Sequence, residues 1–187
     1  MPLPSEKRYT VDDIYALPEG QRAELIDGQL FYMAPPARKH QDIVVELSSI
    51  IKDYIRNHAG ECKVYPAPFA VFLGTKEGDE NRSDYVEPDI SVICDRGKLN
   101  EKGCLGAPDW IVEVVSPSSR KRDYYQKLAL YQTNGVREYW IVDPDKKLVI
   151  VYDLEYEKPP VLYPFTDTVP VRIYEDLAIS FAGFDIQ

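Results

Sequence analysis

Hydrophobic and polar residues alternate along this chain with two periods, one typical of helices and one typical of strands. Over residues 43–55, apolar side chains recur at steps of three and four, which predicts a long helix with one buried face. A short helix is expected to begin after Thr10, because Asp13 follows it at the spacing of a capping box. A third helix is expected over residues 119–133, and Gly135 suits its C-terminal cap.

Several shorter segments are rich in β-branched and aromatic residues, which predicts strands. Residues 23–26 and 29–33 flank Asp27-Gly28, a dipeptide that favours the tight turn of a β-hairpin. A second hairpin is expected over residues 138–152. The run at residues 110–115 is almost wholly apolar, which is typical of a strand buried on both faces. Further strands are expected at residues 64–73 and 85–94 and in the proline-broken tail, and a loop at residues 97–106.

No long Gly/Ser-rich or highly charged linker divides the chain, so we expect a single α/β domain over residues 1–187. The segments with recognisable motifs form a core of about residues 9–153, and residues 154–187 are expected to form peripheral strands. No apolar run approaches the roughly 20 residues of a membrane-spanning helix, and no hydrophobic signal segment follows Met1. We therefore expect a cytoplasmic protein that does not bind membranes.

The net charge limits how the protein can contact nucleic acid, and the cysteines bear on whether it has disulfides or a zinc site. A net charge of -9 argues against a surface that coats nucleic acid regardless of sequence, so any contact with nucleic acid should be local. Cys62, Cys94 and Cys104 form no C-x-x-C pair, and their number is odd. This pattern indicates neither a disulfide framework nor a zinc site, and we expect buried free thiols.

One carboxylate, Glu113, lies inside the apolar run at residues 110–115. Burying a carboxylate is costly unless it is paired or binds a metal. Asp89 comes earlier by 113 − 89 = 24 positions, which allows a strand, a loop and a return to a neighbouring strand, so the two carboxylates can meet. Lys127, on the expected third helix, is placed to lean back toward Glu113. A purely structural ion pair between Glu113 and Lys127 is the alternative to a metal site.

Other charged residues extend this candidate site. Two or three convergent carboxylates are the oxygen ligands that Mg²⁺ or Mn²⁺ prefers, and Glu24 in the first hairpin is a third carboxylate, unless its place beside a turn leaves it exposed. Glu87, two residues before Asp89 and on the same strand face, is an alternative ligand. Arg120 and Arg122 belong to a basic run that could contact phosphates, although such a run is more often a solvated face.

The order of these residues resembles a known superfamily. Pro88-Asp89, then Glu113 on a core strand, then Lys127 on the following helix are similar to the PD-(D/E)XK restriction-endonuclease-like superfamily in its variant with a migrated lysine. Within it, roughly residues 9–153 resemble the Uma-two family of endonucleases. The segments that carry this resemblance are Glu24 to Leu30, His40, Pro88 to Ile93, Val112 to Ser119, Arg122-Asp123, Lys127, Tyr131 and Gly135 to Pro144.

The resemblance implies a restriction-endonuclease-like α/β fold, in which helices and extra β-hairpins flank a central five-stranded mixed sheet. It also implies a Mg²⁺ or Mn²⁺ site built from Asp89, Glu113 and the backbone carbonyl of Val114. Glu24 would complete the catalytic set, and Lys127 would take the role of the motif lysine. Secondary candidates for the site are Glu87, His40 and Tyr131, and candidates for phosphate binding are Arg120 and Arg122.

These observations leave three functional hypotheses. The leading one is a Mg²⁺-dependent nuclease that cuts DNA, with RNA as a second candidate substrate, and that acts as a homodimer. The second is a non-catalytic module that keeps the nuclease fold and binds nucleic acid or protein. The third is a metal-dependent hydrolase of small phosphorylated compounds.

Overall fold

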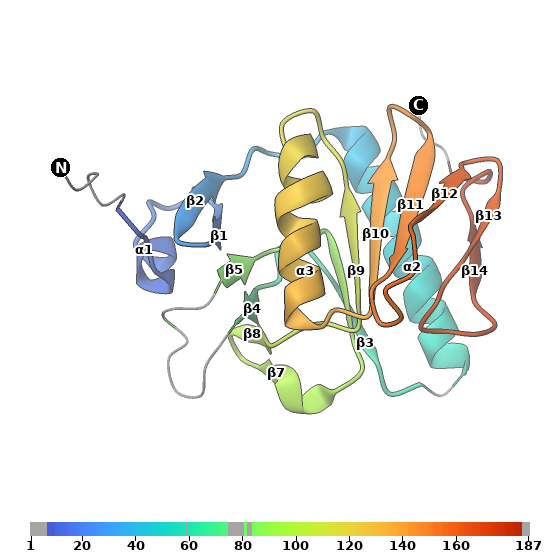
Figure 1. The fold of residues 1–187 in the computed structure, drawn as a ribbon, viewed down its shortest axis with the longest axis horizontal. Coiled ribbons are helices and arrows are strands. Elements are labelled where there is room, and N and C mark those ends of the chain that lie inside the picture. The colour runs from blue at the N-terminus through green and yellow to red at the C-terminus, as the bar shows by residue number, and fades with distance from the viewer. Residues whose placement is uncertain (1–6, 59, 75–80, 82–83, 185–187) are drawn as a thin grey trace.

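The computed structural model describes residues 7–58, 60–74, 81 and 84–184. Within these residues, two sheets of six strands each form the body of the protein, and a pair of short strands lies at its edge. Figure 1 shows the two larger sheets next to each other, with helix α3 (Leu128–Asn134) in front of the central sheet and α2 (Arg38–Asn57) behind it. The predicted α/β class is therefore confirmed.

The central sheet has the strand order β12-β11-β10-β9-β6-β3. It is mixed, because β9 and β10 run parallel whereas the other neighbours run antiparallel. Five strands were expected, and the sixth is β12 in the tail, which pairs with β11 at the edge. The strands are β3 (Lys63–Pro66), β6 (Ile90–Ile93), β9 (Trp110–Val114), β10 (Glu138–Asp143), β11 (Leu148–Asp153) and β12 (Val161–Pro164).

The second sheet has the order β2-β1-β5-β4-β8-β7, and it contains the hairpin predicted around Asp27-Gly28. The predicted strands at residues 64–73 and 85–94 are each broken in two, with one half in each sheet. Prolines at 66, 68 and 88 lie at these breaks, where a missing N–H donor interrupts a strand. The bounds are β1 (Ala23–Ile26), β2 (Gln29–Tyr32), β4 (Val71–Leu73), β5 (Asp84–Val86), β7 (Leu99–Asn100) and β8 (Gly103–Leu105).

The segment at residues 97–106 was expected to be a loop, but it contains β7 and β8. These strands are only two and three residues long, and β8 is held by pairing with β4, a contact that local sequence does not reveal. The tail forms β13 (Thr168–Pro170) and β14 (Ala178–Ser180), in line with the expected peripheral strands.

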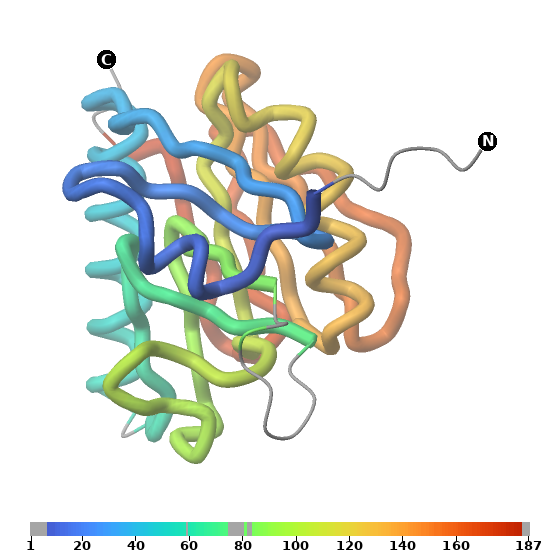
Figure 2. The backbone as a smooth tube through the Cα atoms, turned by 90° about the vertical axis from the view of Figure 1, so that its left-hand side faces the viewer, coloured from blue at the N-terminus to red at the C-terminus, as the bar shows by residue number. Residues whose placement is uncertain are grey.

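Three helices form where the sequence indicated, although α2 extends beyond residues 43–55 at both ends and the third helix has a wider turn over Arg122–Lys127 before α3. In α1 (Val11–Tyr15), the backbone N–H of Thr10 donates to the carboxylate of Asp13, as expected for a capping box. Gly135 follows α3 in the left-handed conformation that favours glycine. Figure 2 faces the second sheet and shows the β1–β2 hairpin between α2 on one side and α3 on the other.

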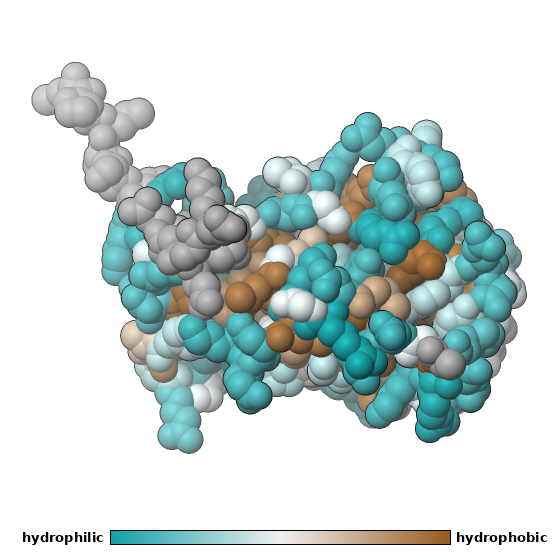
Figure 3. All heavy atoms as spheres, turned by 90° about the horizontal axis from the view of Figure 1, so that it is seen from below, coloured by the Kyte–Doolittle hydropathy of each residue, from teal (hydrophilic) through white to brown (hydrophobic). Residues whose placement is uncertain are grey.

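The two faces of β9 face different helices. Val112 and Val114 pack in the core under α2, whereas Ile111 and Val115 pack in the core under α3. Glu113 points to the α3 side, as the alternation along the strand predicted. Seen from below, hydrophobic residues reach the surface mainly in the middle of the molecule, and hydrophilic residues surround them (Figure 3). Among the described residues, no helix is long and apolar enough to cross a membrane.

The cysteines differ from the prediction in part. Cys62 and Cys94 form a disulfide, so the expectation of free thiols is wrong for these two residues. They meet because β3 and β6 pair with Lys63 opposite Ile93, a register that joins segments 32 residues apart. Cys104 is a buried free thiol, as predicted.

Candidate functional site

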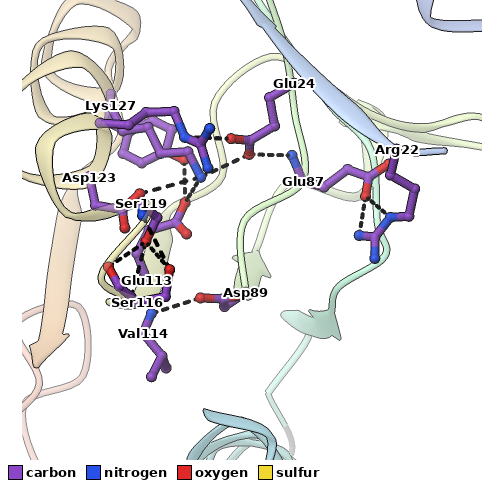
Figure 4. A network of polar contacts seen from close by, with 12 residues as sticks. Arg22, Glu24, Glu87, Asp89, Glu113, Val114, Ser116, Ser119, Asp123 and Lys127 are labelled. Atoms are coloured by element: carbon purple, nitrogen blue, oxygen red, sulfur yellow. Dashed lines mark hydrogen bonds and ion pairs between the residues drawn. The ribbon is translucent and has the colours of Figure 1, made fainter. Parts of the chain in front are cut away.

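The candidate site is a cluster of charged side chains between the two sheets and beneath the helix that follows β9 (Figure 4). Lys127 is at its centre: its Nζ lies 2.7 Å from Oε1 of Glu113 and 2.8 Å from Oε1 of Glu24. All three residues are buried. The structure thus brings Glu24, Glu113 and Lys127 together, and the alternative that Glu24 is exposed is wrong.

A wide turn of the helix makes this arrangement possible. Residues Arg122–Lys127 form a π-helical turn, in which hydrogen bonds join residues five apart. Both ends of the turn reach Glu24: Arg122 Nε lies 3.2 Å from Oε2, and Lys127 contacts Oε1. In a regular α-helix, at about 100° per residue, two residues five apart would point about 140° away from each other. The wide turn therefore aligns two cations on one carboxylate.

Asp89 lies at the other end of the cluster, just before β6. Its Oδ2 accepts a hydrogen bond from the backbone N–H of Val114 at 2.7 Å and lies 3.0 Å from Nε2 of His40, in the first turn of α2. The structure thus brings His40 and Val114 to Asp89. Asp89 shares the region with Glu113 but has no ion pair with Lys127 among the described residues.

Glu87, the alternative ligand, has its carboxylate engaged elsewhere. It contacts the guanidinium of Arg22, whose Nε donates at 2.9 Å, and accepts a hydrogen bond from the hydroxyl of Tyr85. Figure 4 shows the Glu87–Arg22 pair extending away from Asp89. The backbone N–H of Glu87 donates to Oε1 of Glu24 at 3.1 Å, so Glu87 supports the site through its main chain.

Tyr131, a secondary candidate, lies four residues after Lys127 and is fully buried. Its hydroxyl donates to Oε1 of Glu113 at 2.7 Å, on the same oxygen that Lys127 contacts. Burial strongly raises the pKa of Tyr131, and the nearby Glu113 carboxylate adds to this effect. Tyr131 is therefore a neutral donor that fixes the orientation of Glu113.

Asp123 is a member of the cluster to which the sequence analysis gave no role. It is only 2% exposed, and its Oδ1 lies 3.8 Å from Nζ of Lys127. Burial raises the pKa of Asp123, which Lys127 partly offsets. A sequence signal existed, because Asp123 and Lys127 are four residues apart on the expected helix and thus share a face. Helical spacing alone did not distinguish a site residue from a surface ion pair.

The two arginines proposed for phosphate binding lie in different places. Arg122 is in the cluster on Glu24, and its guanidinium also lies 5.5 Å from the ring centre of Phe31. Arg120 instead pairs with Asp143, the last residue of β10, at 3.3 Å and with Asp145, just after it, at 3.4 Å. Both guanidinium groups are therefore ion-paired in this structure.

The charges of the cluster do not balance. Burial raises the pKa of Glu113; Lys127 opposes this effect, and the other carboxylates add to it. Burial alone would lower the pKa of Lys127, but Glu113, Glu24 and Asp123 together raise it, so the ammonium stays charged. Lys127 and Arg122 are the cations on three carboxylates, Glu24, Glu113 and Asp123, and the fourth carboxylate, Asp89, has only His40 beside it. An excess of buried negative charge is an environment that favours a further cation.

The residues present fit a hard divalent ion through two carboxylates. Lys127 and Tyr131 contact one oxygen of Glu113, and the described contacts of the Asp89 side chain also use one oxygen. Among the residues that the structure describes, no group of three or more Asp, Glu, His or Cys side chains converges as a complete metal cage. Mg²⁺ does not require one, because it commonly binds through one or two carboxylates and keeps several waters.

Three comparisons relate this chain to known proteins. The Uma2 family model, described as "Putative restriction endonuclease", matches residues 11–182. An uncharacterized protein of Synechocystis sp. is 26% identical over 133 residues, which are 71% of this chain and 66%, just under two thirds, of that protein. A crystal structure of a "putative nuclease" from Anabaena variabilis is 25% identical and has a TM-score of 0.74, with 92% of this chain and 94% of that chain covered. Its likeness confirms the restriction-endonuclease-like fold. The protein belongs to the Uma2 family.

Proposed function

We propose that this protein is a metal-dependent nuclease that hydrolyses phosphodiester bonds at the Asp89–Glu113–Lys127 cluster. One observation carries the proposal: Lys127 is ion-paired with Glu113 on β9, next to Asp89, in a fold shared with a protein described as a nuclease. Two carboxylates lie at adjoining strand ends, and a lysine follows on the next helix. This order matches the PD-(D/E)XK motif in its variant with a migrated lysine. The family description supports the same class of activity.

Asp89, Glu113 and the backbone carbonyl of Val114 are the residues that would hold Mg²⁺ or Mn²⁺. When bound, such an ion would lower the pKa of a water molecule and polarise the phosphate. The protein side chains have separate tasks. Lys127, charged and fixed by its carboxylate partners, supplies positive charge for the phosphate or orients the attacking water. Tyr131 keeps Glu113 oriented through its hydroxyl.

The proposed substrate is nucleic acid. DNA is the first candidate, ahead of RNA, because the family model carries the description "Putative restriction endonuclease". The net charge of -9 opposes strong binding of a phosphate backbone by one chain alone. A homodimer would extend the contact surface and bring two sites to two strands. We therefore propose a dimer as the active form, which light scattering at several protein concentrations would test.

Calorimetry followed by a cleavage assay tests the activity. We expect Mn²⁺ and Mg²⁺ to bind to the wild-type protein and to bind far more weakly to Asp89→Asn, and we expect the wild type to nick plasmid DNA only when the ion is present. The matched control is Asp42→Asn, which removes a half-buried carboxylate of α2 that pairs with Arg38 and not with the cluster. A parallel panel of RNA and small phosphodiesters separates a nuclease from a hydrolase of small phosphorylated compounds.

A second candidate function is a non-catalytic binding module. The observation in its favour is that the cluster is closed, since Glu24, Glu113, Asp123 and Lys127 are each at most 3% exposed. In this case Lys127 would serve as a structural counter-ion. Nucleic-acid binding without any divalent-ion affinity would favour the module over the nuclease.

A further inference from the structure

Asp123 has no role in the proposed reaction, yet it is buried next to Lys127, which has one. Its side chain is 2% exposed, and the structure gives Oδ1 no hydrogen-bond donor. A side-chain hydrogen bond with Ser119 favours the charged carboxylate, but leaving Oδ1 buried without a donor still costs free energy that an apolar side chain would not cost. Since packing alone does not explain a carboxylate here, its charge needs an explanation.

The backbone around Asp123 is fixed. Its N–H donates to the carbonyl of Ser119 at 3.0 Å, and its carbonyl accepts a hydrogen bond from the hydroxyl of Tyr139, on β10, at 3.0 Å. Tyr139 is itself fully buried. The wide turn therefore fixes the backbone of Asp123, and its carboxylate lies on the same side of the helix as Lys127, four residues later.

Three carboxylates contact the ammonium of Lys127 from three elements. Glu24 comes from β1 and Glu113 from β9, at 2.8 and 2.7 Å, and Asp123 comes from the helix itself at 3.8 Å. The Glu113 contact is the one that a metal ion would weaken, because the same carboxylate is a proposed metal ligand. Glu24 and Asp123 would then keep the ammonium in place.

We infer that Asp123 is a positioning residue: through its charge it holds the Lys127 ammonium in line with Glu113 while Glu113 is engaged by the metal. The inference rests on the proposed function and gives a role to Asp123, which carries part of the family resemblance but is not one of the proposed catalytic residues or metal ligands. Its effect acts on the chemical step, because a displaced lysine loses its alignment with the reacting phosphate, whereas substrate binding elsewhere is unchanged. Misplacement of a catalytic group by about 1 Å can lower a rate by about a hundredfold.

A pair of substitutions separates charge from shape. Asp123→Asn keeps the shape and removes the charge, and Asp123→Glu keeps the charge and lengthens the side chain. We expect kcat of Asp123→Asn to fall at least tenfold with KM nearly unchanged, and Asp123→Glu to retain more activity than Asp123→Asn. Gln126→Ala, an exposed position on the same turn, is the control and should match the wild type. Full activity of Asp123→Asn together with loss in Asp123→Glu would mean that Asp123 only fills space, and would overturn the inference.

A second readout does not depend on nuclease activity. In protein labelled with ¹⁵N at the lysine ammonium groups, the buried Lys127 ammonium should give a signal in slow exchange with water. We expect Asp123→Asn to shift this signal and to speed its exchange, and Asp123→Glu to preserve it. An unchanged Lys127 signal in Asp123→Asn would overturn the inference even if the wild type cuts DNA. Absence of cleavage by the wild type, with the expected change in the signal, would instead count against the proposed function alone.

Discussion

Two buried glutamates on neighbouring strands, Glu113 on β9 and Glu138 on β10, meet the cost of burial in different ways. Glu113 is satisfied by side chains, the ammonium of Lys127 and the hydroxyl of Tyr131. Glu138 accepts hydrogen bonds from the backbone N–H groups of Arg172 and Ile173 and from the indole of Trp140. Partners that are side chains can rearrange when an ion or a substrate arrives, whereas backbone donors cannot move without local unfolding.

The comparison separates a proposed metal ligand from a carboxylate bound mainly by the backbone. Glu113 lies among other carboxylates, which raise its pKa in addition to burial, and both of its partners come from the helix that follows β9. Glu138 has no second carboxylate among the contacts described, and it connects β10 to the segment before β14. Burial by itself therefore does not distinguish the proposed ligand from Glu138, whereas the kind of partner does.

Removing Lys127 should have the largest effect of the changes considered. In Lys127→Met, Glu24, Glu113 and Asp123 lose their shared counter-ion inside the protein, and breaking a buried ion pair in this way costs about 3–5 kcal/mol of unfolding free energy. Urea denaturation at pH 7 measures this change. Lys121→Met, at an exposed position of the same helix, should change the free energy by less than about 0.5 kcal/mol. Equal stability of both variants would show that the cluster carries no buried charge.

The carboxylate of Glu138, which accepts hydrogen bonds from the backbone, should titrate in an accessible pH range. Burial raises the pKa of Glu138 to about 7, although the N–H donors of Arg172 and Ile173 act in the opposite direction. A raised pKa in the folded state means that the wild type loses stability as the pH rises from about 4.5 to about 7, by about 3 kcal/mol at about 1.4 kcal/mol per unit. Above pH 7 the loss should level off.

Two measurements check this prediction. The unfolding free energy of the wild type, taken relative to Glu138→Gln, should fall over that pH range, because only the wild type titrates. Trp140 fluorescence should follow the same transition, since its indole donates to Glu138 at 2.6 Å. A fluorescence signal that does not depend on pH in the wild type would contradict the raised pKa.

The affinity for Mn²⁺ should depend on Glu113 but not on Glu138. We expect Glu113→Gln to lower the affinity for Mn²⁺ about a hundredfold, because an amide replaces a proposed ligand, and Glu138→Gln to leave it unchanged. Isothermal titration calorimetry on both variants and the wild type gives the three affinities. Similar losses in both variants would point to a general disturbance of the central sheet rather than to a site at Glu113.

Much of this contrast could be predicted from the sequence. The apolar run around Glu113 and the period of two along β9 predicted both its burial and the face to which it points. The hairpin at Asp27-Gly28 was predicted from local turn chemistry, and it places Glu24 on the strand that meets the cluster. These features are encoded locally, which is why patterns of neighbouring residues reveal them.

The remaining features depend on contacts between distant segments. Pro88 marks the break in the predicted strand at residues 85–94, but no local pattern encodes that its two halves pair in different sheets. The Cys62–Cys94 disulfide follows from the register of β3 and β6 in the same way. The wide turn that brings Arg122 to Glu24 is one local departure from an otherwise α-helical pattern, so the spacing of hydrophobic residues does not predict it.

The smallest effect considered concerns His40, which contacts the proposed metal ligand Asp89. Its Nε2 lies 3.0 Å from Oδ2 of Asp89, so it orients a proposed ligand in the way that outer-shell partners of metal sites do. We expect His40→Ala to lower Mn²⁺ affinity about tenfold, at the lower end of the range for such partners. Gln41→Ala, the next residue and exposed, is the control in the same calorimetric titration. If His40→Ala matched this control, the hydrogen bond to the backbone N–H of Val114 would suffice to orient Asp89, and His40 would only join α2 to the sheet.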